Sequence, residues 1–188
     1  MAMNTLPTEE LTRRFIDSAT AAGASVTSVR RSAEDLAKAL KRITAEEDAV
    51  LMPEPDFLSP DLFAIFRGEK KIVTNPTGPQ ITTIDACVTD AFCGIASTGS
   101  VCVPITKGLT SAVSVLSRRH VVVIDGDTIV LRPRDVFALE DSVAKRLTSN
   151  FSYVTGPSAT ADMGPLVIGV HGPGKLDIII LEELHGKH

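Results

Sequence analysis

The first part of the chain alternates between helical and extended patterns of apolar positions. Leu11 and Phe15 begin an apolar series at the spacing of an amphipathic helix, and Gly23 offers a stop before the β-favouring stretch 25–29. Ser32 can then cap a second helix, which has acidic residues in its first turn and apolar residues on one face. This pattern predicts a helix, a strand and a second helix in succession.

The next part predicts two short strands on either side of a helix. The strands are expected at 49–52 and 72–73, and Ser59-Pro60-Asp61 is a strong helix start because proline in the first turn loses no hydrogen bond. The segment 75–83 contains two prolines and a glycine and has no apolar period. We therefore expect it to be a loop, and the best candidate for a mobile cover.

The second half of the chain is richer in β-favouring runs. A hairpin is predicted over 92–103, because a turn containing Gly99 separates two apolar stretches. A second strand pair is predicted at 120–124 and 128–131, around Asp125-Gly126-Asp127. A helix should follow, with one face formed by Val136, Leu139, Val143 and Leu147.

The last two predicted strands complete the fold class. One covers 151–155, and the other contains four consecutive aliphatic residues at 178–181, which is typical of a strand covered on both faces. The alternation of helices and strands predicts an α/β fold: a three-layer α/β/α sandwich with a mainly parallel mixed sheet. In such folds ligands tend to bind at loops beyond the carboxyl ends of the strands. We expect one domain over 1–188, with 1–8 and 183–188 as flexible tails.

Composition and charge narrow the class of protein. Apolar residues make up 44% of the chain and charged residues 22%, as in a packed globular protein. The net charge of −4 does not favour nucleic acid as a partner. No apolar run approaches the roughly 20 residues that span a bilayer, and the N-terminus lacks the apolar core of a secretory signal. We therefore expect a cytoplasmic protein without a membrane span.

The cysteines indicate a reducing compartment and give no support for a bound cluster. Cys87, Cys93 and Cys102 leave one thiol unpaired under any disulfide scheme, and none forms a C-x-x-C motif. An iron-sulfur cluster usually needs about four thiolates. We expect no cofactor and no metal in this chain. The cysteines should serve as small buried residues of the core.

The stretch 155–162 is the most informative one for chemistry. It follows a predicted strand directly, and Gly156, Ser158 and Thr160 offer backbone amides and hydroxyls that can receive an anion. It lacks the Gly-Lys-Ser/Thr of a Walker loop and the spacing of G-x-G-x-x-G, so neither ATP nor NAD is supported. The structural alternative is a turn in which Ser158 caps a short helix and Asp162 hydrogen-bonds the loop.

Two further places are candidates for the same site. His171 and Gly172 lie in a glycine-rich stretch before the final strand, where an imidazole can act as acid, base or anion donor, or can simply bond a loop carbonyl. In the 92–103 hairpin a carboxylate precedes the first strand and hydroxyls occupy the tip, where they could bind a ligand. The structural alternative is that the tip is an ordinary turn. These candidate residues are Asp90, Thr98, Gly99 and Ser100.

Taken together, four stretches resemble the lactate-utilisation protein C (LutC/YkgG) family, whose domain is the LUD domain. They are Val-Thr-Asp-Ala at 88–91, Ile-Ala-Ser-Thr-Gly-Ser at 95–100, Thr-Gly-Pro-Ser-Ala-Thr-Ala-Asp at 155–162 and Gly-Val-His-Gly-Pro at 169–173. The resemblance covers nearly the whole chain and is strongest over 85–181. It implies a fold similar to the NagB, RpiA and CoA-transferase group, and a role in oxidising L-lactate to pyruvate beside separate iron-sulfur proteins.

One departure from the family pattern bears on mechanism. The family commonly has a glutamate just before the Thr-Gly of the hairpin, and this chain has Ser97 there. A neutral hydroxyl cannot replace a carboxylate as base or nucleophile, so no catalytic glutamate is carried over.

The leading hypothesis is a non-redox subunit or accessory protein of an iron-sulfur L-lactate oxidation system. It would bind a small carboxylate or phosphate-containing metabolite, or a partner, where the three stretches converge, with Asp162 orienting and His171 donating or shuttling a proton. Two rivals remain: a free-standing CoA-transferase-like or sugar-phosphate isomerase-like enzyme, and a structural scaffold. Turnover by the chain alone and homo-oligomer formation are left open.

Overall fold

A six-stranded parallel sheet forms the centre of the computed structural model, which describes residues 6–105, 110–139, 150–161 and 165–183. Every strand pair in this sheet is parallel. Its order is β1 (Ser25–Arg30), β11 (Lys175–Glu182), β7 (Arg119–Asp125), β4 (Ala86–Asp90), β2 (Val50–Leu51) and β3 (Ile72–Val73). The expected α/β class is confirmed, and the antiparallel pairs lie in two smaller sheets.

Strand β11 lies inside the sheet and is buried on both faces. Ile179 and Leu181 pack into the core on one face, whereas Ile178 and Ile180 pack into the core on the other. Four consecutive aliphatic residues suit this position because successive side chains of a strand point to opposite faces. The prediction of a doubly covered final strand is confirmed.

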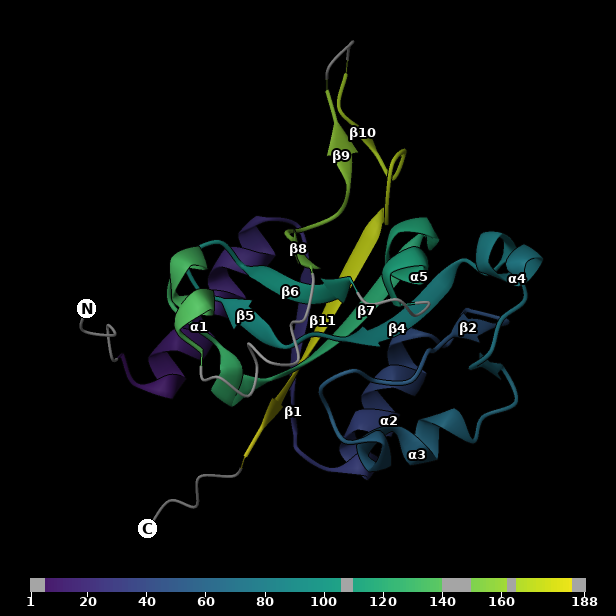
Figure 1. Cartoon of the computed structure of the whole chain (residues 1–188), viewed down its shortest axis with the longest axis horizontal. Helices are drawn as coiled ribbons and strands as arrows, with labels where there is room; N and C mark the ends of the chain where they lie inside the picture. Colours follow the sequence, from purple (N-terminus) through teal and green to yellow (C-terminus); the bar gives the residue numbers. More distant parts are fainter. Residues whose placement is uncertain (1–5, 106–109, 140–149, 162–164, 184–188) are drawn as a thin grey trace.

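Different elements cover the two faces of the sheet (Figure 1). Helices α2 (Ala33–Ile43) and α3 (Pro60–Arg67) pack on one face. The other face carries α1 (Thr8–Ala21), α4 (Gly78–Thr83), α5 (Thr110–Leu116) and a sheet of β5 (Cys93–Ile95), β6 (Ser100–Ile105) and β8 (Asn150–Val154). A small arm of β9 (Ala159–Thr160) and β10 (Val167–Ile168) projects away from the rest (Figure 1).

The helix starts and stops predicted from local signals are confirmed. Ser32 accepts a hydrogen bond from the Asp35 amide at 3.1 Å, which caps α2. Ser59 caps α3 in the same way through Asp61, although this bond is longer at 3.4 Å. Gly23 has φ of 89°, so it ends α1 in the left-handed conformation that glycine adopts without strain.

The prediction of a loop over 75–83 is wrong, because residues Gly78–Thr83 form α4. The Gln80 side chain accepts a hydrogen bond from the Thr77 amide at 2.9 Å, as in a capping box. Ile81 then packs against the core cluster that contains Cys87 and Val113. A six-residue helix is too short to show an apolar period, so only its packing reveals it.

The prediction of a second strand pair is also wrong. Strand β7 pairs with β4 and β11, and the chain after it turns through a 3₁₀ helix at Gly126–Thr128. The segment 128–131 contributes only an isolated bridge between Ile95 and Val130. The segment 128–131 cannot pair with β7, because β4 and β11 already flank β7 on both sides.

The helix expected to carry Val136 and Leu139 is only partly described. Residues Pro133–Ala138 form a 3₁₀ helix, whereas Val143 and Leu147 lie outside the described residues. Helix α5 was not predicted. No helix in the described segments has the length and apolar character to cross a bilayer.

Candidate functional site

Two of the candidate stretches meet at the amino-terminal edge of the main sheet. The Ser158 amide donates a hydrogen bond to the Pro173 carbonyl at 2.8 Å, and the Gly169 amide donates to the Ser158 carbonyl, also at 2.8 Å. Residues 171–173 lead into β11, so this contact lies where the parallel strands begin. These two loops therefore lie at the edge opposite to the carboxyl ends of the main-sheet strands, where ligands more often bind in such folds.

Glycines allow this close approach of backbone segments. Gly156 has φ of 62°, and a Cβ atom there would lie 2.0 Å from the Ala22 carbonyl oxygen at the end of α1. A Cβ atom on Gly172 would lie 3.0 Å from Cβ of Ser158. The loop is thus held between the end of α1 and the segment before β11. Ser158 does not cap a helix, because strand β9 follows it.

These loops border a cavity of about 320 Å³, which we call the His171 hollow. Four predicted site residues line it, namely Gly156, Ser158, His171 and Gly172. The rest of the lining combines hydroxyl groups with aliphatic side chains: Val103, Pro104, Ile105, Ser111, Ser114, Val115, Ser152, Tyr153, Val154, Thr155, Pro157, Pro173 and Leu176. Among these described lining residues there is no Asp, Glu, Lys or Arg, so the hollow offers hydroxyl donors without a fixed negative charge.

The hairpin tip reaches the same region through a chain of hydroxyl groups. Oγ1 of Thr98 lies 2.6 Å from Oγ of Ser100, which lies 2.7 Å from Oγ1 of Thr155 on the wall of the hollow. Gly99 has φ of 66° and lies against the backbone of Ala19, where a Cβ atom would come within 2.2 Å of the Ala19 nitrogen. Thr98, Gly99 and Ser100 therefore brace the hollow from outside and are not part of its lining.

Asp90 lies at the opposite edge of the sheet, at the carboxyl end of β4. Asp90 is 1% exposed. Its carboxylate accepts hydrogen bonds from the amides of Asp56, Phe57 and Leu58, at 3.0, 2.7 and 2.8 Å. Burial raises the pKa of this carboxyl, and the three amides oppose that shift. Asp90 anchors the 56–58 segment and does not share a cavity with His171.

The remaining predicted residues belong to the projecting arm or lie outside the described residues. Thr160 is part of β9 and pairs with Val167 of β10. Asp162, predicted to orient a ligand, lies outside the described residues.

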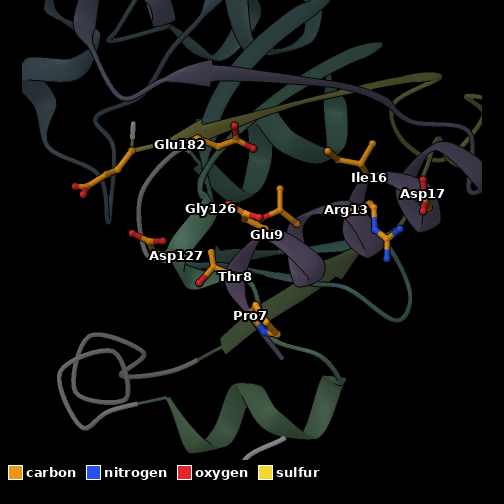
Figure 2. Close-up of a pocket in the computed structure, with 11 residues that line it drawn as sticks. Pro7, Thr8, Glu9, Arg13, Ile16, Asp17, Gly126, Asp127 and Glu182 are labelled. Atoms are coloured by element: carbon orange, nitrogen blue, oxygen red, sulfur yellow. The ribbon is translucent and has the colours of Figure 1, made fainter. Parts of the chain in front are cut away.

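A larger groove of about 660 Å³ lies at the carboxyl edge of the sheet and was not predicted. Gly126 and Asp127 follow β7, and the groove runs along α1 past Arg13 (Figure 2). Its acidic side chains are Glu9, Asp17, Asp127, Glu182 and Glu183. With five carboxylates beside one arginine, this groove repels small anions, whereas the described lining of the His171 hollow contains no carboxylate. The only sequence signal for it was the acidic residues that follow two strands.

A fully buried histidine lies outside the predicted site residues. His120 on β7 is 0% exposed, and its Nε2 lies 2.8 Å from Oγ1 of Thr89. Burial lowers its pKa to about 4, so it is neutral at physiological pH. Its register neighbour on β11, Leu176, lines the His171 hollow. Within the described residues no group of three or more His, Cys, Asp or Glu side chains is placed to hold a metal ion.

Comparison with known proteins decides the family. The model of the LUD domain matches residues 12–181. The chain belongs to the LUD domain family. This match covers all the elements that build the hollow and confirms the resemblance stated from the sequence motifs.

Curated relatives of this LUD domain carry one common name. The protein named Lactate utilization protein C in Halalkalibacterium halodurans is 32% identical over 103 residues, which are 53% of this chain and 45% of the relative. The protein of the same name in Bacillus licheniformis is 34% identical over 93 residues, or 47% of this chain and 39% of the relative. The matched stretches thus span less than half of either relative.

A solved structure confirms the fold. The crystal structure of a DUF162 family protein from Deinococcus radiodurans has a TM-score of 0.71 and 22% sequence identity. The likeness covers 95% of this chain and 100% of that chain.

Proposed function

We propose that this LUD domain acts in lactate utilisation as a non-redox subunit or accessory protein, and that it binds a small carboxylate in the His171 hollow. Its relatives named Lactate utilization protein C support the metabolic context. The observation that carries the ligand assignment is the described lining of the hollow, which brings Ser158, His171 and Gly172 together and contains no carboxylate side chain.

The chemistry of the hollow favours a monoanion with a short apolar part. The Ser158 and Thr155 hydroxyls and the imidazole of His171 can each donate a hydrogen bond to a carboxylate. Aliphatic walls such as Val103 and Leu176 suit a methyl or methylene group. Phosphate is usually held by Lys or Arg, and neither is among the described lining residues. L-lactate and pyruvate fit this description.

Ligand binding can be measured as a gain in stability. L-lactate or pyruvate at 100 times its dissociation constant should raise the free energy of unfolding by about 2.7 kcal/mol, and phosphate should have a smaller effect at equal concentration. Ser158→Ala and His171→Ala should each weaken the binding of the carboxylate ligand by roughly tenfold, because each removes a hydrogen bond to a charged group. Ser97→Ala is the matched control, since Ser97 is exposed on the hairpin and does not line the hollow. No stabilisation by either carboxylate, or equal effects of Ser97→Ala and Ser158→Ala, would contradict the proposed ligand.

The subunit role is tested separately. We propose that the iron-sulfur clusters of the system reside in partner proteins, and affinity purification from lactate-grown cells should then recover such proteins with this chain. If the purified chain alone turned over an acyl-CoA or a sugar phosphate, and His171→Ala abolished that turnover, the free-standing enzyme would replace the subunit as the explanation.

A further inference from the structure

Cys93 and Cys102 occupy directly opposite positions in the antiparallel pairing of β5 with β6. Both residues are 0% exposed and belong to one core cluster, together with Phe92, Ile95 and Val136. Because opposite residues of an antiparallel pair point to the same face, their Cβ atoms lie about 4.5–5.5 Å apart. The proximity of Cys102 is the main cause that raises the pKa of the Cys93 thiol.

This position meets the backbone requirement of a disulfide. Directly opposite residues have Cα atoms about 4.5 or 5.5 Å apart, and disulfides span about 4.4–6.8 Å between Cα atoms. A bond between Cys93 and Cys102 can therefore form with only side-chain rotation and small adjustments. Cys87 differs, because it lies on β4 and packs with Leu51 and Val113 in another cluster.

We propose that Cys93 and Cys102 form a modification site, which a low-molecular-weight disulfide oxidises to a cross-strand disulfide. The thiolate of one cysteine attacks a sulfur atom of the small disulfide and displaces one small thiolate. The thiolate of the other cysteine then attacks the mixed disulfide, forms the protein disulfide and releases the second small thiolate. The two cysteines lose two electrons and two protons, and the oxidant leaves as two small thiols.

The fold allows this reaction but makes it slow. Strand β5 pairs with β6 on one side, and on the other side its backbone is hydrogen-bonded to Val130 through Gly94 and Ala96, both at 2.8 Å. The oxidant can therefore reach the thiols only when these contacts open locally. The proximity of Cys102 and burial raise the pKa of the Cys93 thiol, so little thiolate forms at neutral pH. Reaction should therefore speed up as pH rises. Burial also raises the pKa of the Cys87 thiol to about 12.

The disulfide would act on the hairpin that braces the His171 hollow. Cys102 is two residues from Ser100, whose hydroxyl bonds Thr155 on the wall of the hollow. A covalent link between β5 and β6 would keep the base of this hairpin closed. The modification itself does not depend on which ligand the hollow binds.

Peptide mapping of the oxidised full chain tests the proposal. The chain should be incubated with oxidised glutathione at mildly alkaline pH, digested after the free thiols are blocked, and examined by mass spectrometry. We expect a peptide pair joined through Cys93 and Cys102 that has lost two hydrogen atoms, with Cys87 still reduced. The melting temperature of the oxidised chain should rise by roughly 5 °C or more. The Cys87→Ser variant should still give the linked peptide pair and the rise in melting temperature. The Cys93→Ser variant should give neither.

Three results would overturn the proposal: a link that includes Cys87, stable glutathione adducts on Cys93 or Cys102 that never resolve into a link, or three reduced cysteines after prolonged exposure at alkaline pH. Mapping of the unmutated chain keeps the test independent of whether serine is tolerated in the core. None of these measurements involves lactate or a partner protein, so failure here is distinct from failure of the proposed function.

Discussion

The hydroxyl oxygens of Ser100 and Thr155 lie 2.7 Å apart, although 55 positions separate the two residues. Ser100 is 3% exposed, so its hydroxyl depends on protein partners, and it has them on both sides in Thr98 and Thr155. This contact joins the hairpin tip to the wall of the His171 hollow. It explains how a hairpin that does not line the cavity can still affect its shape.

Removal of the Ser100 hydroxyl should cost stability. Ser100→Ala removes hydrogen bonds to the exposed Thr98 and Thr155 hydroxyls, which can bond water instead, and we expect the free energy of unfolding to fall by about 1 kcal/mol. Ser97→Ala, on the exposed side of the same tip, should change it by less than about 0.5 kcal/mol. Urea denaturation of the two variants checks this. Equal losses would show that the hydroxyl chain contributes nothing of its own.

Two glycines offer a matched test of backbone constraint. Gly156→Ala should destabilise the protein by about 2–4 kcal/mol, because Gly156 has φ of 62° and a new Cβ would overlap the Ala22 carbonyl. Gly78→Ala should be neutral or stabilising by up to about 1 kcal/mol, since a Cβ there meets nothing within 4 Å. Denaturation curves give both values. A tolerated Gly156→Ala would mean that the loop can move away from α1.

Asp90 should be more important for stability than an exposed aspartate. Asp90→Ala leaves the amides of 56–58 without their acceptor, and we expect a loss of about 3 kcal/mol together with faster hydrogen exchange of these three amides. Asp48→Ala is the control, because Asp48 is exposed, and it should be close to neutral. Unchanged exchange in the Asp90 variant would show that other contacts hold the segment.

His120 should make stability depend on mildly acidic pH. Its pKa is lowered from 6.5 to about 4 in the folded protein, so between these values the unfolded chain binds more protons than the folded one. The stability contributed by the neutral imidazole is therefore complete above pH 6.5 and is lost as pH falls towards 4, by about 3 kcal/mol. The measurement is the difference in unfolding free energy between the unmutated chain and His120→Gln at several pH values. This difference should shrink as pH falls across that window, and a constant difference would contradict the shift.

The elements predicted correctly are those with signals inside one short stretch. Ser32 and Ser59 mark helix starts because capping joins residues two or three positions apart. Helix α4 and the segment 128–131 were predicted wrongly for the opposite reason. The helix is recognised by the packing of Ile81 against Cys87 and Val113, and the segment failed to become a strand because β7 already had two partners.

The candidate site divides in the same way. Residue type and neighbouring glycines were enough to single out Ser158 and His171, which do line one hollow. Asp90 was grouped with them as a carboxylate before the hairpin, although it lies at the other edge of the sheet. The sequence shows whether a residue precedes or follows a strand. It does not show at which edge of the sheet two distant loops meet.

The sequence by itself determined where α1 ends, where α2 and α3 begin, and that the last strand is covered on both faces. These properties follow from periodicity, capping and backbone sterics, which act over a few residues. Only the tertiary structure decided which strands pair, that the two loops meet before β11, and that the carboxylates gather at the opposite edge. Such contacts form between residues far apart along the chain and depend on the packing of the whole core, so no local pattern contains them.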